Sequence, residues 1–332
     1  MKSLFLTNAY PSVDKPWLGP AVKLQEKGLK SLGVEIAILY LNRLEKGQAV
    51  YLSAFPMIKK RFEEGGFDIL HVQFGGVQAL LGALVAGRRC VITFHGTDLH
   101  GGLPQTMWES ISYKIGVICS KLAIAMAGAS IAVSKNLLEG LWPKLAKRVE
   151  IIPTGVDYQT FRPMDKSYAR AQANLSSDCH YVLFCDGNKD PVKRRDLADQ
   201  AVHILKNRGL NVELLVLTHV PFQKMPLYLN AADVLLVTSE KEGSPNIVKE
   251  ALACNLPVVS VDVGDVEKMI NGVENCVLVS REISAIADSL EAIIASSKRS
   301  NGREIKRNLI DNYEICKSIR SIYQELMRSD KH

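Results

Sequence analysis

Two glutamates frame a short polar segment in the second half of the chain. Glu242 and Glu250 are eight positions apart, and Gly243, Ser244 and Pro245 directly follow the first of them. Serine is favoured as a helix N-cap and proline at the first helical position, so we expect a helix capped by Ser244. The exposed N–H groups of a helix start bind anions such as phosphate. The sequence therefore predicts a phosphate site with a carboxylate on each side, which suits a nucleotide diphosphate carrying a sugar.

This helix supplies the predicted anion site. Its first backbone N–H groups belong to Asn246, Ile247 and Val248. Asn246 and Glu250 are four residues apart and therefore share one face of the helix. Glu250 is accordingly expected one turn below the phosphate.

Short apolar runs stand on both sides of the helix. Val234–Val237 precedes it and Val258–Val261 follows it. Such runs around a helical segment predict two parallel strands. The helix should end near Cys254, with Asn255 as a left-handed cap. The loop at Glu242 then lies at the carboxyl end of a parallel strand, where open α/β sheets bind their ligands.

The same alternation extends through the chain. Its 332 residues exceed one typical core, so two domains are expected. Alternating strands and helices predict parallel, doubly wound sheets. The pattern breaks at Pro153–Asp157 and then starts again. Further strands are predicted at Ser3–Thr7, Glu35–Tyr40, Asp68–Val72, Arg89–Thr93, Ala129–Val133, Val149–Ile152, Tyr181–Cys185, Val212–Leu217 and Val277–Val279, and one of the helices at Lys135–Leu145.

Several strings of the chain resemble motifs of glycosyltransferase family 4. The E-x7-E region of that family matches Glu242–Asn246, Glu250–Ala253 and Pro257–Val259, and its interdomain segment matches Ile152–Asp157. The resemblance covers nearly the whole chain. It implies the α/β fold called GT-B, in which two doubly wound Rossmann-like domains face each other across a cleft. It also implies an acceptor-side domain at 1–157, a nucleotide-sugar-binding domain at 158–315, and a last helix, 316–332, that crosses back onto the first domain.

The resemblance also singles out residues of the first half. His95 follows an apolar strand and stands where the family places a histidine near the donor sugar. Asp98 is expected to orient His95 or to mark the acceptor pocket. Gly19 lies where the family has a glycine-rich loop near the donor phosphate. His71, inside an apolar run, is expected to be buried and hydrogen-bonded.

A basic loop follows the first strand of the second half. The family has an arginine where Asn188 stands, and its lysine is best matched by Lys193, with Lys189 as a second charge. Arg194 and Arg195 could add to this charge or be solvated surface charges. Asp265 replaces the second glycine of a family turn and is left out of the predicted site.

The resemblance implies a mechanism without a metal. Glu250 would accept hydrogen bonds from the ribose hydroxyls, and Glu242 would hold the sugar, with the N–H groups of Gly243 and Ser244 nearby. Lys193 and the helix start would stabilise the leaving diphosphate. The expected reaction moves a hexose-type sugar from a UDP- or GDP-type donor, with retention, to a glycan or polyprenyl-linked acceptor. The short Pro221–Leu229 connection resembles the branch that builds cell-surface polysaccharides such as teichuronic acid.

The composition limits the class of protein and the compartment in which we expect it. The net charge is +6, with 47% hydrophobic and 23% charged residues, so the chain is globular. Its seven scattered cysteines lack metal-binding spacing and suit a reducing cytoplasm. No basic tract interleaved with aromatics points to nucleic acid. Basic groups such as Lys59–Arg61 leave open a peripheral contact with the anionic inner face of the cell membrane.

Three other functions remain open from the sequence. One is a nucleotide-sugar epimerase of the same fold. Another is a degenerate subunit that binds a nucleotide sugar without catalysis, for which Asn188 and Asp265 are the support. The third is a membrane-recruited partner protein, suggested by basic groups such as Lys59–Arg61 and Arg88–Arg89.

Overall fold

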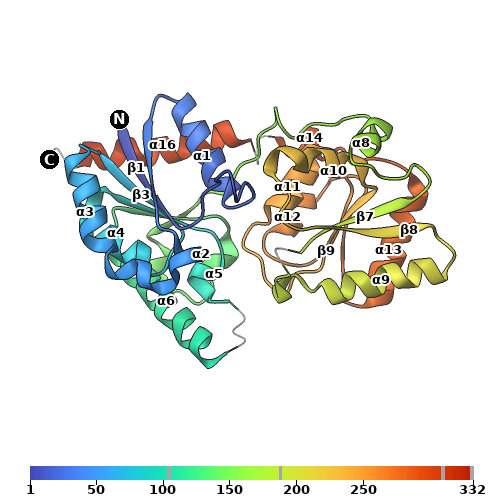
Figure 1. Ribbon diagram of the computed structural model, residues 1–332, viewed down its shortest axis with the longest axis horizontal. Helices are drawn as coiled ribbons and strands as arrows, with labels where there is room; N and C mark the ends of the chain where they lie inside the picture. The colour runs from blue at the N-terminus through green and yellow to red at the C-terminus, as the bar shows by residue number, and fades with distance from the viewer. Residues whose placement is uncertain (103–105, 187–188, 308–310, 330–332) are drawn as a thin grey trace. The chain divides into compact units, whose positions relative to one another are not determined.

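The chain forms two parallel β-sheets, and each belongs to its own structural unit (Figure 1). This computed structural model describes residues 1–102, 106–186, 189–307 and 311–329. Unit 1 comprises residues 1–11, 18–154 and 312–332, and unit 2 comprises residues 12–17 and 155–311.

The sheet of unit 1 has six strands in the order β2-β1-β3-β4-β5-β6, with parallel pairing throughout. Its central strands are buried on both faces, which is why they read as uninterrupted apolar runs. The strands are β1 Lys2–Thr7, β2 Glu35–Tyr40, β3 Ile69–Gln73, β4 Cys90–Phe94, β5 Ala129–Ala132 and β6 Val149–Ile151.

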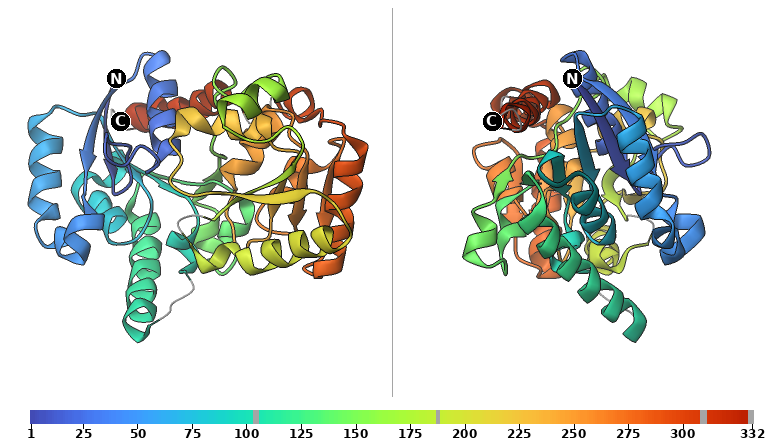
Figure 2. Two further views of the ribbon diagram at one scale, coloured as in Figure 1. Left: turned by 45° about the vertical axis from the view of Figure 1, so that its right-hand side comes forward. Right: turned by 90° about the vertical axis from the view of Figure 1, so that its left-hand side faces the viewer.

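Helices cover both faces of this sheet (Figure 2). One face packs against α3, α4 and α6, and the other against α1 and α16, which run side by side. The helices are α1 Pro20–Ser31, α2 Arg43–Lys46, α3 Ala54–Glu64, α4 Val77–Ala86, α5 Thr97–His100, α6 Met107–Met126, α7 Pro143–Ala146 and α16 Asn312–Ser329, with 3-10 turns η1 Gly47–Leu52, η2 Gly87–Arg89 and η3 Lys135–Leu138.

His71 links the sheet of unit 1 to the C-terminal helix. Its Nδ1 lies 2.5 Å from the Tyr323 hydroxyl and its Nε2 lies 2.7 Å from Thr93 Oγ1. Burial lowers the pKa of His71 to about 3, so the ring is neutral. The prediction of a buried, hydrogen-bonded histidine is confirmed.

The sheet of unit 2 has five parallel strands in the order β11-β10-β9-β7-β8. The strands are β7 His180–Cys185, β8 Val212–Leu217, β9 Val234–Val237, β10 Val258–Val261 and β11 Cys276–Val279. The helices are α8 Lys166–Gln172, α9 Arg195–Asn207, α10 Met225–Ala231, α11 Asn246–Ala253, α12 Val266–Ile270, α13 Ile283–Ser296 and α14 Gly302–Ile305, with 3-10 turns η4 Pro191–Lys193 and η5 Phe222–Lys224.

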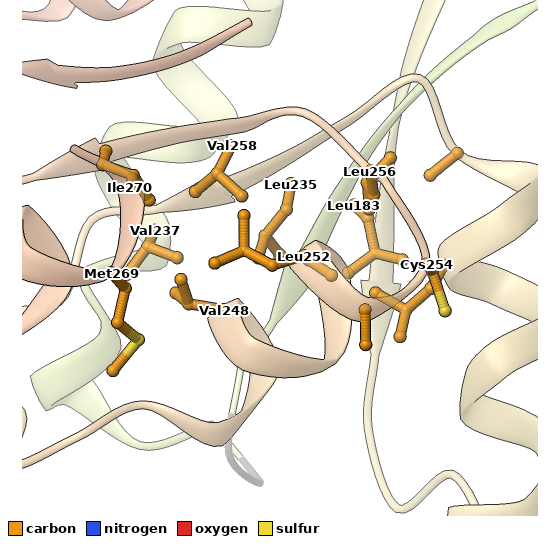
Figure 3. Close-up of a cluster of buried hydrophobic side chains, with 14 of the residues drawn as sticks. Leu183, Leu235, Val237, Val248, Leu252, Cys254, Leu256, Val258, Met269 and Ile270 are labelled. Carbon is orange, nitrogen blue, oxygen red and sulfur yellow. The ribbon is translucent and has the colours of Figure 1, made fainter. Parts of the chain in front are cut away.

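Helix α11 is anchored in the core of unit 2. Figure 3 shows its Val248 and Leu252 among Leu235, Val237 and Val258 of the adjacent strands. Each of these side chains is almost completely buried. Truncating such a leucine to alanine typically costs about 2–5 kcal/mol. The start of α11 is therefore held in a fixed place beside the end of β9.

One helix prediction is wrong. The expected helix at Lys135–Leu145 is divided into the 3-10 turn η3 and the short helix α7. Gly140 lies between them with a φ of 76°, and Pro143 starts α7. A glycine with positive φ followed by a proline ends one helical segment and begins another.

Candidate active site

The loop after β9 brings two predicted catalytic residues into contact. Lys193 Nζ donates a hydrogen bond of 2.5 Å to Glu242 Oε1, and the pair is mostly shielded from solvent. Ser239 Oγ donates a second bond, 2.8 Å long, to the same oxygen. Both partners lie at the carboxyl edge of the sheet, because Lys193 follows β7 and Glu242 follows β9. This is the edge at which a ligand was expected.

The backbone around Lys193 is fixed to the end of β9. Thr238 Oγ1 lies 2.9 Å from the Lys193 carbonyl oxygen, to which it donates. The Glu240 N–H donates to the Val192 carbonyl oxygen at 2.8 Å. The turn itself is capped by Asp190, whose carboxylate accepts from the Val192 N–H. Lys193 is thus positioned by a rigid frame, as a group that acts on a ligand requires.

The start of α11 differs from the prediction. The N-cap is Pro245, and the Ser244 hydroxyl makes no capping bond. Ser244 Oγ instead donates to Asp265 Oδ2, a carboxylate oxygen across the loop, at 2.9 Å. The Val248 N–H donates to the Pro245 carbonyl oxygen, so it is already used within the helix. An anion site at Asn246, Ile247 and Val248 stays a prediction, whereas Ser244 as the helix cap is wrong.

Asp265, which was left out of the predicted site, contacts it directly. Besides accepting from Ser244, it places a buried Oδ1 that has no hydrogen-bond partner among the described residues. Burial raises the pKa of Asp265, and the charge of Lys249 opposes that shift. The preceding Gly264 has a φ of 63°, and a Cβ there would lie 2.7 Å from the Gly243 carbonyl oxygen. The turn before α12 therefore packs tightly against the Gly243–Ser244 loop.

Lys249 is a second residue that the sequence did not identify. Only 1% of it is exposed, although a lysine inside a helical segment is typical of a solvated face. Burial lowers its pKa to about 8, while Asp265 and Glu250 favour its charged form. Lys249 is therefore a buried amine whose charged form two carboxylates favour.

Glu250 occupies the position that the E-x7-E pattern gives it, but it is buried. It is 9% exposed, and desolvation raises its pKa to about 7, against the opposing charge of Lys249. Near neutral pH this carboxyl group is present in both protonation states. It can therefore exchange hydrogen bonds with neutral hydroxyl groups of a ligand.

The other predicted cations lie outside this cluster. Lys189 is exposed and lines a separate hollow of about 520 Å³ with Arg194 and Arg195. Arg194 pairs with Asp196 at 2.8 Å, which agrees with the alternative that it is a surface charge. Asn188 lies outside the described residues.

His95 and Asp98 are organised by the ends of β3 and β4 in unit 1. Asp98 accepts backbone N–H bonds from Gly75 at 2.9 Å, His95 at 3.0 Å and Gly96 at 2.8 Å. It thereby ties the two loops together and fixes the backbone of His95. The His95 ring lies 4.5 Å from that of Phe74, and its Nε2 lies 3.0 Å from Gln73 Oε1.

A cavity of about 720 Å³ opens beside Asp98. Its lining includes Asp98, Phe74 and the side of α6 that carries Ile111 and Ile115. Gly19 is not part of this lining. It starts α1 with a φ of 64°, and a Cβ there would lie 2.3 Å from the Ala9 carbonyl oxygen. That close approach explains the glycine, and its contact with a donor stays a prediction.

Two features are absent from the described residues. No group of three or more His, Cys, Asp or Glu side chains in that part of the chain could hold a metal ion. No described helix combines the length and the apolar character needed to cross a membrane.

Both halves of the chain match models of glycosyltransferase families. Residues 19–160 match the family model Glycosyltransferase Family 4, and residues 165–296 match Glycosyl transferases group 1. TuaC of Bacillus subtilis, named as a glycosyltransferase of teichuronic acid biosynthesis, is 23% identical over 87% of this chain and 88% of its own length.

Two solved structures show the same fold. Sucrose-phosphate synthase from Thermosynechococcus elongatus has a TM-score of 0.78 and 18% identity, with 99% of this chain and 100% of that chain covered. Anabaena HepE, solved in complex with UDP, has a TM-score of 0.69 and 17% identity, with 98% and 100% covered. The two family models together span most of the sequence, so this chain belongs to the family 4 and group 1 glycosyltransferases and has the GT-B fold.

Proposed function

We propose that this chain is a retaining hexosyltransferase that takes its sugar from a nucleotide diphosphate donor. The proposed acceptor is a hydroxyl of a glycan or polyprenyl-linked molecule in bacterial cell-surface polysaccharide synthesis. The observation that carries the proposal is the Lys193–Glu242 pair at the carboxyl edge of a parallel sheet. The helix that follows this loop, α11, carries the buried Glu250. A uridine nucleotide is favoured over guanosine because HepE was solved with UDP and with UDP-glucose.

Glu250 and Glu242 have different tasks in this proposal. Glu250, which is 9% exposed, accepts hydrogen bonds from the ribose hydroxyls. Glu242 is already held at Oε1 by Lys193 and Ser239, so its carboxylate has a fixed orientation for the hydroxyls of the donor sugar. Fixed polar groups of this kind need little reorganisation when the reaction begins.

Lys193 stabilises the leaving group. The bond between the anomeric carbon and the β-phosphate oxygen breaks, and the diphosphate keeps its electron pair. The Lys193 ammonium group and the start of α11 compensate the growing negative charge, so no metal is required. The acceptor oxygen bonds to the same face of the sugar, and its proton passes to the departing phosphate oxygen. The anomeric configuration is thereby retained.

The first test is a transfer assay with UDP- and GDP-hexoses and a set of glycan and polyprenyl phosphate acceptors. We expect nucleotide release that depends on the acceptor, with the product's anomeric configuration, measured by NMR, equal to that of the donor. An inverted product would refute the retaining mechanism. A changed donor sugar without transfer would favour the epimerase, and nucleotide binding without turnover would favour the degenerate subunit.

A further inference from the structure

Helix α6 carries a line of exposed apolar side chains along its whole length. At 100° per residue, their positions all fall within an arc of about 100° on one side of the helix. Trp108 is the most exposed of them, at 77%. We call this set the α6 stripe; it consists of Met107, Trp108, Ile111, Ile115, Ile118, Leu122 and Met126.

The α6 stripe is large for a surface that faces only water. A helix of 20 residues is about 30 Å long, and the stripe runs from its first turn to its last. The opposite side of α6 is buried through Ser120, Ala123 and Ile124, so the helix is already packed on its own unit. Figures 1 and 2 show one end of α6 extending past the other elements of unit 1. Exposed apolar surfaces of this extent are typical of sites that bind a protein or a membrane.

The charges beside the stripe favour a membrane with anionic lipids. Lys114 and Lys121 lie at one edge of the arc, where long lysine side chains can reach lipid phosphates while apolar neighbours enter the bilayer. Between residues 106 and 148 the basic residues outnumber the acidic ones. The basic residues are Lys114, Lys121, Lys135, Lys144, Lys147 and Arg148, and the acidic ones are Glu109 and Glu139.

The segment before α7 adds a second aromatic anchor. Trp142 is 71% exposed, and Lys121 Nζ lies 3.4 Å from the carbonyl oxygen of nearby Gly140. This segment is therefore adjacent to the C-terminal half of α6. Tryptophan and lysine together are the residue types that settle at the boundary between lipid tails and water.

From these observations we infer that α6 lies along the surface of an anionic bilayer, with the α6 stripe among the lipid headgroups and upper tails. Docking on the bilayer does not depend on the proposed function, but the role of docking in presenting an acceptor rests on it. The cavity beside Asp98 is lined by Trp108, Ile111 and Ile115, which also belong to the stripe. Under the proposed function, this continuity lets a lipid-anchored acceptor present its polar head to the cavity while its tail remains in the bilayer.

Vesicle flotation tests the inference with the full chain. Vesicles of phosphatidylcholine with about a third phosphatidylglycerol should bind the protein, and pure phosphatidylcholine should bind it less. Higher salt should weaken binding without abolishing it, because only the electrostatic part is screened. The variant Ile118→Glu/Leu122→Glu changes two stripe residues that do not line the cavity beside Asp98, and we expect at least about tenfold weaker binding. Ile305→Glu is the matched control, since Ile305 is 51% exposed but lies in unit 2.

Each outcome decides the matter. Absence of binding at low salt, or equal binding by the double variant, would overturn the inference. A dimer in light scattering that the double variant dissolves would assign the stripe to a second copy of the chain instead. Circular dichroism checks that the double variant is folded. If it is not, Ile118→Gln/Leu122→Gln replaces it in the flotation assay. Nucleotide binding distinguishes the two proposals: a protein that responds to UDP but ignores vesicles refutes only the docking surface, and the reverse refutes only the proposed function.

Discussion

At the scale of single residues, the site is defined by how burial changes the chemistry of its charges. Glu250 has a pKa of about 7 and Lys249 a pKa of about 8, both because they are removed from water. Lys193 and Glu242 instead form a pair at the edge of the sheet. Protonation near neutral pH therefore affects the proposed ribose contact of Glu250.

Nucleotide affinity should depend on the ionisation of Glu250. With a pKa of about 7, its carboxyl group is mostly protonated at pH 6 and mostly ionised at pH 8. The ionised form is the better acceptor for ribose hydroxyls, so we expect UDP to bind up to about tenfold more tightly at pH 8. Calorimetry on the wild type and on Glu250→Gln measures this, because the nucleotide's own titration is common to both. An identical pH dependence in the two proteins would disprove the assignment.

The same carboxyl group should lower stability at high pH. The folded-state pKa of Glu250 lies above its usual value of 4.5, so the folded state binds the proton more tightly than the unfolded state. The free energy of unfolding therefore falls as pH rises from about 4.5 through 7. Glu250→Gln should be more stable than the wild type by about 1–3 kcal/mol at pH 8, with little difference at pH 5. Urea unfolding at both pH values tests this, and a variant that is less stable at pH 8 would contradict it.

Lys193 should matter for turnover and not for folding. Lys193→Ala removes the cation proposed to stabilise the leaving diphosphate, and we expect kcat to fall by about 100-fold to 1,000-fold. Its neighbour Arg194 is the control, since it pairs with Asp196 at the surface. Arg194→Ala should keep most activity, and both variants should melt within a few degrees of the wild type. Equal loss of activity in the two variants would show that Lys193 has no special role.

At the scale of elements, the Glu242–Ser244 loop after β9 is held in place by the turn that follows β10. The Gly264–Asp265 turn after β10 packs against Gly243 and holds Ser244, and the Asp265 carboxylate favours the charged form of buried Lys249 in α11. The loop before α11 is thus held by a carboxylate from a different loop.

Removal of one of these charges should cost more than removal of both. Asp265→Ala leaves Lys249 buried without its main counter-charge, and we expect a loss of about 1–3 kcal/mol. Lys249→Met replaces the cation by an apolar side chain of similar length, and the double variant should recover much of that loss. A double-mutant cycle by urea unfolding measures the coupling. Strictly additive losses would show that Lys249 and Asp265 do not interact.

At the scale of the whole molecule, the sequence predicts the framework better than the site. β2, β8, β9 and β10 could be predicted to the residue as apolar runs, although only β9 and β10 are fully buried and the edge strands β2 and β8 are partly exposed. The break in the pattern at Pro153–Asp157 falls where unit 1 passes into unit 2. The helix pattern failed at Lys135–Leu145, where Gly140 and Pro143 outweigh periodicity.

The unpredicted features all depend on what packs against a residue. Lys249 has the sequence setting of a surface lysine but is 1% exposed, and Ser244 has the setting of a helix cap but its hydroxyl bonds to Asp265. The apolar residues of α6 look like core residues, yet no described part of unit 1 covers them. Spacing along the chain shows which residue types recur, but it does not show which side chains other elements pack against.

The most direct test of the central claim is thermal unfolding with UDP, GDP and ADP. A ligand present at about 100 times its Kd stabilises the folded state by about 2.7 kcal/mol, which is several degrees for domains of this size. We expect a clear rise in Tm with UDP, less with GDP and ADP, and loss of the rise in Glu250→Ala. No shift with any nucleotide, or an undiminished shift in Glu250→Ala, would contradict a donor site built on Glu242, Lys193 and Glu250.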